Sequence, residues 1–317
     1  MMVVDPIYGE ALVYASLLTL LSLGLTLTFL TTKVPNFAHG TFATVGMYVT
    51  LTLNRLYGVS PYVCAVPAAF MGGVVALAQY IFVLRPLTKR GASIITLMVA
   101  TIAFEFILLA LLNIYADYLI EVFRVKSRYF RLSGEEVVVV GVKGLLITAP
   151  ALVVGLAVAL HLLLTKTRFG IAMRAAIENP SLAGALGVNV DLVYQVSWLL
   201  AGALAGLAGG LMPLRFLGNP DRGSMMLISI FAASVAGGFY NIYGGFVGGY
   251  VIGLAEILGT NALSKVFGAW VTSYRLVIPL VAMTITLLAL PTGLTGLVSK
   301  LRRPSGPAML KRWLRWR

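Results

Sequence analysis

A short polar island is the part of this chain where side chains could act on a small molecule. It reads Asn36-Phe37-Ala38-His39-Gly40 and lies at the head of an apolar segment, just after Lys33-Val34-Pro35. An amide and an imidazole in such surroundings cost free energy unless they face a partner or water. We therefore interpret Asn36 and His39, three residues apart on neighbouring faces of one helix, as candidates for a pathway or gate. The alternative is that they only satisfy backbone groups freed by Pro35.

Three more polar residues interrupt or border apolar stretches. Glu105 and Glu256 each lie within an apolar run, where a carboxyl group is either hydrogen-bonded inside a helix bundle or lines a water-filled route. Asn241 precedes a glycine-broken segment, as Asn36 does, and paired breaks of this kind often border a transporter's pathway. With Asn36 and His39, these residues form our candidate set for a translocation pathway.

The remaining sequence offers little for catalysis. It has two histidines, His39 and His161, one cysteine, Cys64, and no Gly-Lys dipeptide, so a P-loop for ATP is excluded. Carboxylates are scattered over separate segments, which leaves no basis for a zinc site or a hydrolytic triad. The sequence predicts a protein that is not an enzyme, has no metal site and has no cofactor of its own.

Composition indicates which elements must position these residues. Hydrophobic residues make up 59 % of 317 positions, charged residues 11 %, and mean hydropathy is +0.94. These values are typical of an integral membrane protein. Stretches long enough to cross about 30 Å of hydrocarbon as helices are expected near 11–32, 37–53, 61–84, 92–115, 145–165, 192–214, 224–243, 244–260 and 276–299. The fold class is therefore an all-α polytopic membrane protein with nine crossings, or eight plus a re-entrant segment, and we expect the chain to turn within 241–245.

The charges predict an orientation and a domain organisation. No Lys or Arg precedes Lys33, and the tail is strongly basic, so we expect the N-terminus outside and the C-terminus in the cytoplasm. The chain then divides into an extracytoplasmic segment (1–10), a transmembrane permease domain (11–299) and a basic cytoplasmic tail (300–317). The charged 116–144 loop fits this arrangement least well.

One predicted cytoplasmic connection, residues 166–191, has helical signals of its own. Asn179 and Pro180 suit an N-cap followed by the first residue of a helix over 180–186, and Gly187 suits its end. A second helical stretch is expected over 169–177. Such a compact element between two spans could receive force from a soluble motor, although an inert loop is equally compatible with it.

Two predicted spans have a glycine at every fourth position. One has Gly202, Gly206 and Gly210, and the other has Gly245, Gly249 and Gly253. Such stripes let helix backbones approach closely in a membrane. We expect tightly packed helix faces, within this chain or against a second subunit.

The net charge of +13 would suggest nucleic acid as the partner of a soluble protein. In a membrane protein, cytoplasmic cations instead meet anionic lipid headgroups. The tail Lys311-Arg312-Trp313-Leu314-Arg315-Trp316-Arg317 mixes cations with indoles and suits the interface. We expect membrane lipids as partners and no nucleic acid.

Several short motifs together resemble the branched-chain amino acid ABC importer permeases of the LivH type. They occur in that family's order between about residues 12 and 298: Asn36 to Gly40 with Gly46-Met-Tyr48, Arg85-Pro-Leu, Ala100-Thr-Ile-Ala, Arg168-Phe-Gly to Gly187-Val, Gly244-Gly-Phe-Val-Gly-Gly, Gly253-Leu-Ala-Glu256 and Leu290-Pro-Thr-Gly293-Leu. The chain departs from the family in its 116–144 loop and its basic tail.

The resemblance implies an importer of several subunits in the cell (inner) membrane. It implies a second, LivM-like permease subunit, two cytoplasmic ATP-binding subunits that use ATP and Mg, and an extracytoplasmic solute-binding protein. It also implies that the loop around 168–187 couples to an ATPase. The residues we assign to that coupling are Arg174, Glu178, Asn179, Pro180, Ala183, Gly184 and Gly187.

We therefore expect a permease that imports a branched-chain amino acid by alternating access. One alternative keeps the architecture and changes the cargo to urea, a short amide or another small polar solute. A second alternative is a secondary transporter in which Glu105 and Glu256 relay protons. The order among Leu, Ile and Val, and whether two copies of this chain pair, are not encoded in any motif.

Overall fold

The computed structural model describes residues 6–139, 141–239, 241–290 and 293–295, so the predicted basic tail (300–317) and half of the N-terminal segment (1–10) lie outside the described residues. Long helices dominate the chain, as the predicted fold class requires. They are α1 (Pro6–Thr32), α2 (His39–Tyr57), α3 (Pro61–Gln79), α5 (Ile94–Phe123), α6 (Leu145–Lys166), α9 (Val190–Leu211), α10 (Arg222–Gly237), α11 (Ile242–Phe267) and α12 (Val277–Ala289).

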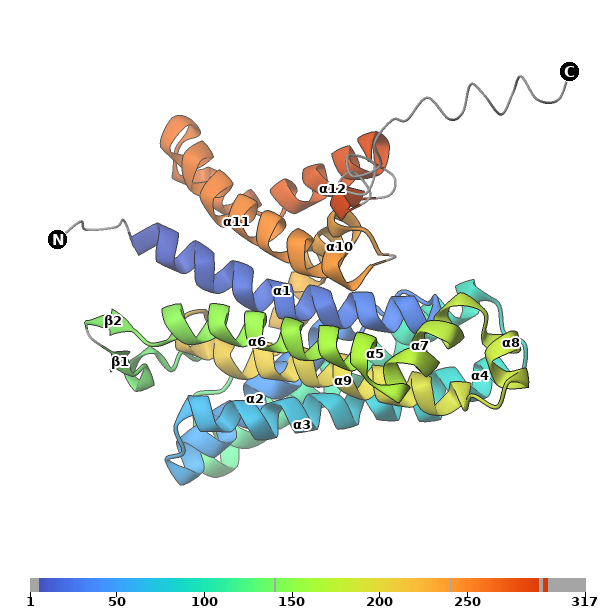
Figure 1. Cartoon of the computed structure of the whole chain (residues 1–317). Coiled ribbons are helices and arrows are strands. Elements are labelled where there is room, and N and C mark those ends of the chain that lie inside the picture. The colour runs from blue at the N-terminus through green and yellow to red at the C-terminus, as the bar shows by residue number, and fades with distance from the viewer. Residues whose placement is uncertain (1–5, 140, 240, 291–292, 296–317) are drawn as a thin grey trace, which may run out of the picture.

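Shorter elements connect these helices. They are η1 (Tyr80–Leu84), α4 (Arg85–Lys89), η2 (Ser133–Glu135), β1 (Val138–Val139), β2 (Val142–Lys143), α7 (Arg168–Glu178), α8 (Pro180–Ala185), η3 (Met212–Leu214) and η4 (Ala269–Tyr274). The strands pair antiparallel as a two-stranded hairpin at one end of the bundle, which we call the hairpin end. The helices α4, α7 and α8 lie at the opposite end, the α7–α8 end (Figure 1).

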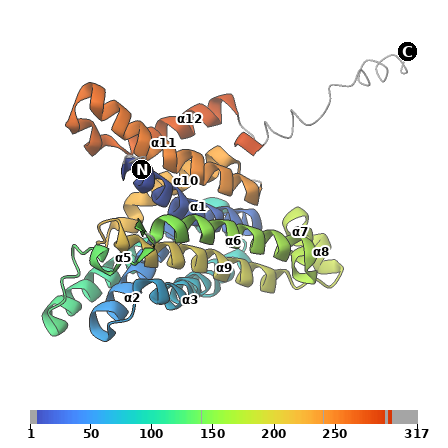
Figure 2. The same ribbon diagram turned by 60° about the vertical axis from the view of Figure 1, so that its left-hand side comes forward.

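Helix α1 is the centre of the bundle. Figures 1 and 2 show it between α10 and α11 on one side and α2, α3 and α9 on the other. Its most apolar 18-residue window is 89 % buried, because the helix is apolar all round and every face meets a neighbour. Its hydroxyl groups donate to carbonyls of their own helix, for example Thr19 Oγ1 to Ala15 O at 2.7 Å. Most polar side chains of α1 are thus satisfied within the protein, but the buried Thr26 hydroxyl has no hydrogen-bond partner among the described residues.

Both glycine stripes pack against other helices of this chain. An added Cβ at Gly206 on α9 would lie 2.3 Å from the Ala68 carbonyl oxygen of α3. At Gly249 on α11 it would lie 2.4 Å from Thr19 Cα of α1. Contacts this short leave no room for a side chain, so α9 with α3 and α11 with α1 form two close backbone interfaces.

The observed spans differ from the predicted ones in three ways. Within the described residues, seven helical segments are long and apolar enough to cross a membrane, whereas α2 and α10 fall outside this group. Helix α10 has only 16 residues, about 24 Å, and does not fill a hydrocarbon core of roughly 30 Å. Helix α10 ends at Gly237 and α11 begins at Ile242, so the turn comes before Ile242 rather than within 241–245; Gly238 adopts a left-handed φ of 104° and Asn241 caps α11. Helix α5 runs to Phe123 and takes up part of the loop predicted from 116.

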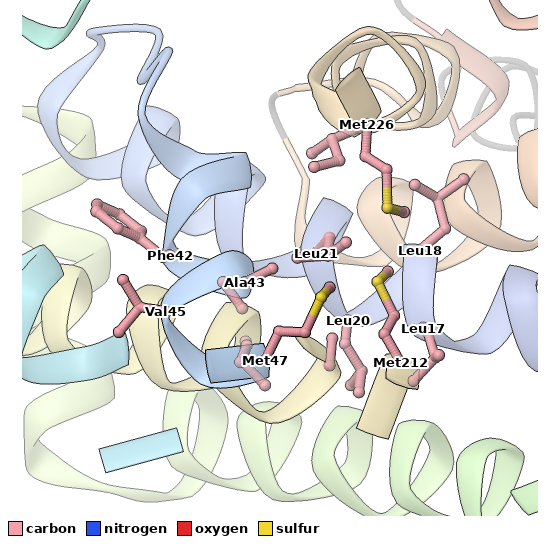
Figure 3. Close-up of a cluster of buried hydrophobic side chains, with 14 of the residues drawn as sticks. Leu17, Leu18, Leu20, Leu21, Phe42, Ala43, Val45, Met47, Met212 and Met226 are labelled. Carbon is pink, nitrogen blue, oxygen red and sulfur yellow. The ribbon is translucent and has the colours of Figure 1, made fainter. Parts of the chain in front are cut away.

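A group of methionine and leucine side chains joins the centre of the bundle. Figure 3 shows Met47 of α2, Met212 of η3 and Met226 of α10 gathered beside Leu17 and Leu18 of α1. Methionine is flexible and fills irregular gaps between helices. Three separate helical elements therefore meet α1 through adaptable side chains.

Candidate functional site

The chain enters α2 through an extended segment buried among other helices. Lys33 ends α1 with a φ of 56°, and α2 begins only at His39. Asn36 is fully buried between them, and its Oδ1 accepts hydrogen bonds from Gln79 Nε2 and from the Ala38 backbone N–H, both at 3.1 Å. The backbone of this irregular segment makes no helical hydrogen bonds, so side chains must bond it instead. Asn36 does so at the Ala38 N–H.

His39 occupies the first position of α2 and lies against the middle of α1. Its Nε2 is 2.9 Å from the Leu21 carbonyl oxygen, so this nitrogen is the donor. Its Nδ1 has no hydrogen-bond partner in the part of the chain that the structure describes. The prediction that Asn36 and His39 lie on neighbouring faces of one helix is wrong, because α2 starts only at His39. His39 is fully buried within the bundle.

Glu105 brings together three helices. Its carboxylate accepts a hydrogen bond from Thr41 Oγ1 of α2 at 2.5 Å and another from Ser224 Oγ of α10. Glu105 lies near the middle of α5, and the residue is only 7 % exposed. We call Thr41, Glu105 and Ser224 the carboxylate site.

The first turns of α2 and α10 meet at this site. An added Cβ at Gly40 would lie 2.1 Å from the Gly223 carbonyl oxygen, and the Gly223 N–H donates to Thr44 Oγ1 at 2.9 Å. Thr41 and Ser224 are each the third residue of their helix, so the Glu105 carboxylate lies beside the first turns of both, where a helix carries partial positive charge. Helices that begin within the membrane and converge on a polar group are a feature of transporter binding sites.

Glu256 has different partners. Its Oε1 lies 2.8 Å from Arg275 Nε, and both carboxylate oxygens accept from the Tyr14 hydroxyl at 2.9 Å. The Arg275 guanidinium lies 4.9 Å from the centre of the Tyr14 ring. Burial alone would lower the pKa of this guanidinium, but Tyr14 and Glu256 raise it, so Arg275 remains charged. Glu256 is therefore half of a buried ion pair that ties α11 to α1 and to the connection before α12.

Asn241 lies in a third place. Its Oδ1 caps α11 by accepting from the Tyr243 N–H at 3.0 Å. Beside it, a cavity of about 660 Å³ opens between α1, α6, α7 and α11, and its wall includes Arg174 and the hydrogen-bonded pair His161 and Tyr243. The five residues of the predicted pathway therefore occupy three sites, and only Asn36, His39 and Glu105 lie around the start of α2.

The 166–191 connection forms the two helices expected from its sequence. Asn179 Oδ1 accepts from the Leu182 N–H at 3.0 Å and caps α8, and Gly187 follows with a φ of 87°. Arg174, Glu178, Asn179, Pro180, Gly184 and Gly187 are exposed. Ala183 is buried against the chain's own core, so its assignment to a surface that contacts an ATPase is wrong. The exposed large apolar residues of this connection are Ile171 on α7 and Leu182 and Leu186 at α8.

Sequence reasoning missed several polar partners. Thr41, Gln79 and Ser224 were not assigned roles, and neither was Arg275 or Arg215, which pairs with Glu10 and Glu136 at the hairpin end. Single hydroxyl and amide side chains are common in apolar helices. Thr41 and Ser224 differ from the other hydroxyl residues only in their contacts with Glu105, which lies 64 and 119 residues away in the sequence.

Comparison with known proteins finds relatives that are named as branched-chain amino acid permeases over most of the chain. The family model for the permease component of branched-chain amino acid transport systems matches residues 7–287. A probable branched-chain amino acid transport permease protein LivH of Methanocaldococcus jannaschii is 46 % identical over 90 % of each chain. The high-affinity permease proteins LivH of Escherichia coli K12 and BraD of Pseudomonas aeruginosa are 29 % and 26 % identical, over 87 % and 90 % of this chain and 90 % and 94 % of their own. No solved structure matches the chain.

Proposed function

Because the chain belongs to the family of branched-chain amino acid permease components, we propose that it is the membrane-spanning subunit of an ATP-binding-cassette importer for branched-chain amino acids. The family's members are transport subunits rather than enzymes, and the chain is a multi-pass membrane protein. In this proposal the cargo crosses by alternating access, and ATP with Mg is used by partner subunits.

The observation that supports a transport pathway most directly is the carboxylate site. Thr41, Glu105 and Ser224 gather polar atoms where two helices begin inside an apolar bundle. Asn36 and His39 support the start of α2, so a shift of α2 against α1 would move Thr41 relative to Glu105 on α5 and Ser224 on α10. We assign Asn36, His39 and Glu105 to the pathway or gate. Glu256 belongs to an ion pair that holds neighbouring helices together, and Asn241 lies at the cavity near the α7–α8 end.

The α7–α8 end is the proposed contact with an ATPase. It presents the charged Arg174 and Glu178 together with the exposed apolar side chains of Leu182 and Leu186. Because α7 is packed on the core through Met173 and Ala176, a force applied to α8 reaches α9 and α1 without passing through a loose loop. This end would then face the cytoplasm, with the N-terminus outside and the C-terminus inside the cell membrane.

The proposed assembly includes further subunits. They are a second, LivM-like permease, two cytoplasmic ATP-binding subunits and an extracytoplasmic solute-binding protein, surrounded by membrane lipids. The exposed apolar faces of α5 and α12 offer surface for the second permease or for lipid.

Reconstitution tests the function. The chain is co-purified with the products of neighbouring transport genes, placed in proteoliposomes, and tested for uptake of radiolabelled leucine with ATP inside. We expect uptake that requires ATP and the binding protein. Uptake of urea or a short amide, but not of leucine, would show that the cargo is a small polar solute. Leucine uptake by this chain alone under a proton gradient would show that it is a secondary transporter.

A further inference from the structure

The Glu105 carboxyl group is buried and has no cationic partner among the described residues. None of the ion pairs among the described residues involves it; those pairs use Glu10, Asp117, Glu136, Asp191 and Glu256. Its two partners are hydroxyl groups, which donate hydrogen bonds but carry no charge. The N-terminal ends of α2 and α10 contribute only partial positive charge. A carboxylate this deep normally has a full cationic partner.

An apolar surface adjoins the carboxylate on α10. Met225 follows Ser224 directly and is 53 % exposed, and Ile228 lies one helical turn beyond Ser224 on the same face and is 37 % exposed. The site therefore offers one negative group and, within a helical turn, two uncovered aliphatic side chains. A primary ammonium group joined to a branched hydrocarbon chain matches both parts.

We propose that Glu105 binds the ammonium group of the transported amino acid, while Met225 and Ile228 contact its aliphatic side chain. This assignment rests on the proposed function. It gives the carboxylate its missing cation only when cargo is present. Thr41 and Ser224 hold the carboxylate in place from two helices, so arrival of the ammonium group would change the hydrogen bonds that join α2, α5 and α10.

Leucine uptake by the assembled transporter tests the role of Glu105. Glu105→Gln keeps the size and removes the charge, Glu105→Asp keeps the charge, and Glu121→Gln removes an exposed carboxylate from the same helix as a control. We expect Glu105→Gln to lower uptake per folded complex by about tenfold or more, as loss of a charged hydrogen bond does, with the control unchanged. Normal uptake in Glu105→Gln, or loss of uptake only through loss of folded protein, would overturn the assignment.

Cargo protection gives a second measurement that does not depend on the binding protein. In a Cys64→Ser background, Met225→Cys is alkylated by a maleimide in the assembled membrane complex. Leucine should slow the reaction severalfold, whereas 4-methylpentanoate, which has the same branched chain and carboxylate without the amino group, should not. Adding Glu105→Gln should abolish protection by leucine.

The outcomes separate this inference from the function itself. Equal protection by leucine and 4-methylpentanoate, or protection that persists in Glu105→Gln, would overturn the inference while leaving leucine import intact. Absence of ATP-dependent leucine uptake by the wild-type complex would overturn the proposed function, and the inference with it.

Discussion

Two buried carboxylates of this chain sit in contrasting surroundings. Glu256 has Arg275 at 2.8 Å and the Tyr14 hydroxyl on both oxygens, whereas Glu105 has only the hydroxyls of Thr41 and Ser224. A buried charge with a fixed cation is stabilised whether or not a ligand is present, while one with neutral donors still lacks compensation. The comparison separates a residue that holds helices together from one that is available to a passing cation.

The contrast also extends to the backbone around each residue. Glu256 lies in the middle of a continuous helix, α11, which packs along α1 through Gly249 and Gly253. The Glu105 side chain instead meets the first turns of two helices that start inside the bundle. Continuous helices resist relative movement, and interrupted ones provide points where the chain can bend.

Breaking the Glu256 pair should have the largest effect on stability. Glu256→Ala leaves Arg275 as a half-buried, unpaired charge and should lower the free energy of unfolding by about 3 kcal/mol. Thermal unfolding in detergent and abundance in the membrane measure this. The double variant Glu256→Gln with Arg275→Met should recover part of the loss, and a single variant as stable as Glu121→Ala would contradict the ion pair's structural role.

Separating α2 from α10 should have the next largest effect. A Cβ at Gly223 would lie 2.1 Å from the Gly40 carbonyl oxygen, so Gly223→Ala should push the two helix starts apart and cost about 1 to 3 kcal/mol. Uptake should fall as well, because Thr41 and Ser224 then cannot both reach Glu105. Gly155→Ala in α6 is the matched control, since no atom lies within 4 Å of its added Cβ. Equal stability of these two variants would argue against the close contact.

Neutralising Glu105 should change stability much less than neutralising Glu256. The amide of Glu105→Gln can still accept from one hydroxyl, so we expect a change below about 1 kcal/mol. Comparing the unfolding temperatures of Glu105→Gln and Glu256→Gln under one condition measures the difference. A larger loss for Glu105→Gln would mean that Glu105, like Glu256, mainly holds the bundle together.

Bulk on α8 should leave both carboxylates and the fold unaffected. Gly184 has open space around it, so Gly184→Trp should change stability by less than about 0.5 kcal/mol. It should nevertheless abolish substrate-stimulated ATP hydrolysis if α8 seats on an ATPase. Ala183→Trp, at a buried position that packs against the chain's own core, should instead reduce the amount of folded protein. Full stimulation in assembled Gly184→Trp complexes would reject this docking site.

The sequence alone was sufficient for the fold class and for several local details. Long apolar runs can only be spanning helices in lipid, because backbone groups there must bond within their own segment. Asn179 before Pro180 predicted the start of α8, and Gly187 its end, because caps are decided by neighbouring residues. These features depend on residues close together in the chain.

Only the tertiary structure decided how deeply each polar residue is buried and which groups it contacts. The sequence singled out Asn36, His39, Glu105 and Glu256 as costly polar residues, but nothing near them distinguished a paired carboxylate from an unpaired one. Arg275 reaches Glu256 across a change of helix, and Ser224 reaches Glu105 across 119 residues. The start of α2 inside the bundle likewise depends on Gln79 and Thr101, whose side chains bond the extended segment before it. Which polar residue meets a charge, and which meets only hydroxyl groups, is therefore fixed by how the helices pack, because the compensating groups come from distant parts of the chain.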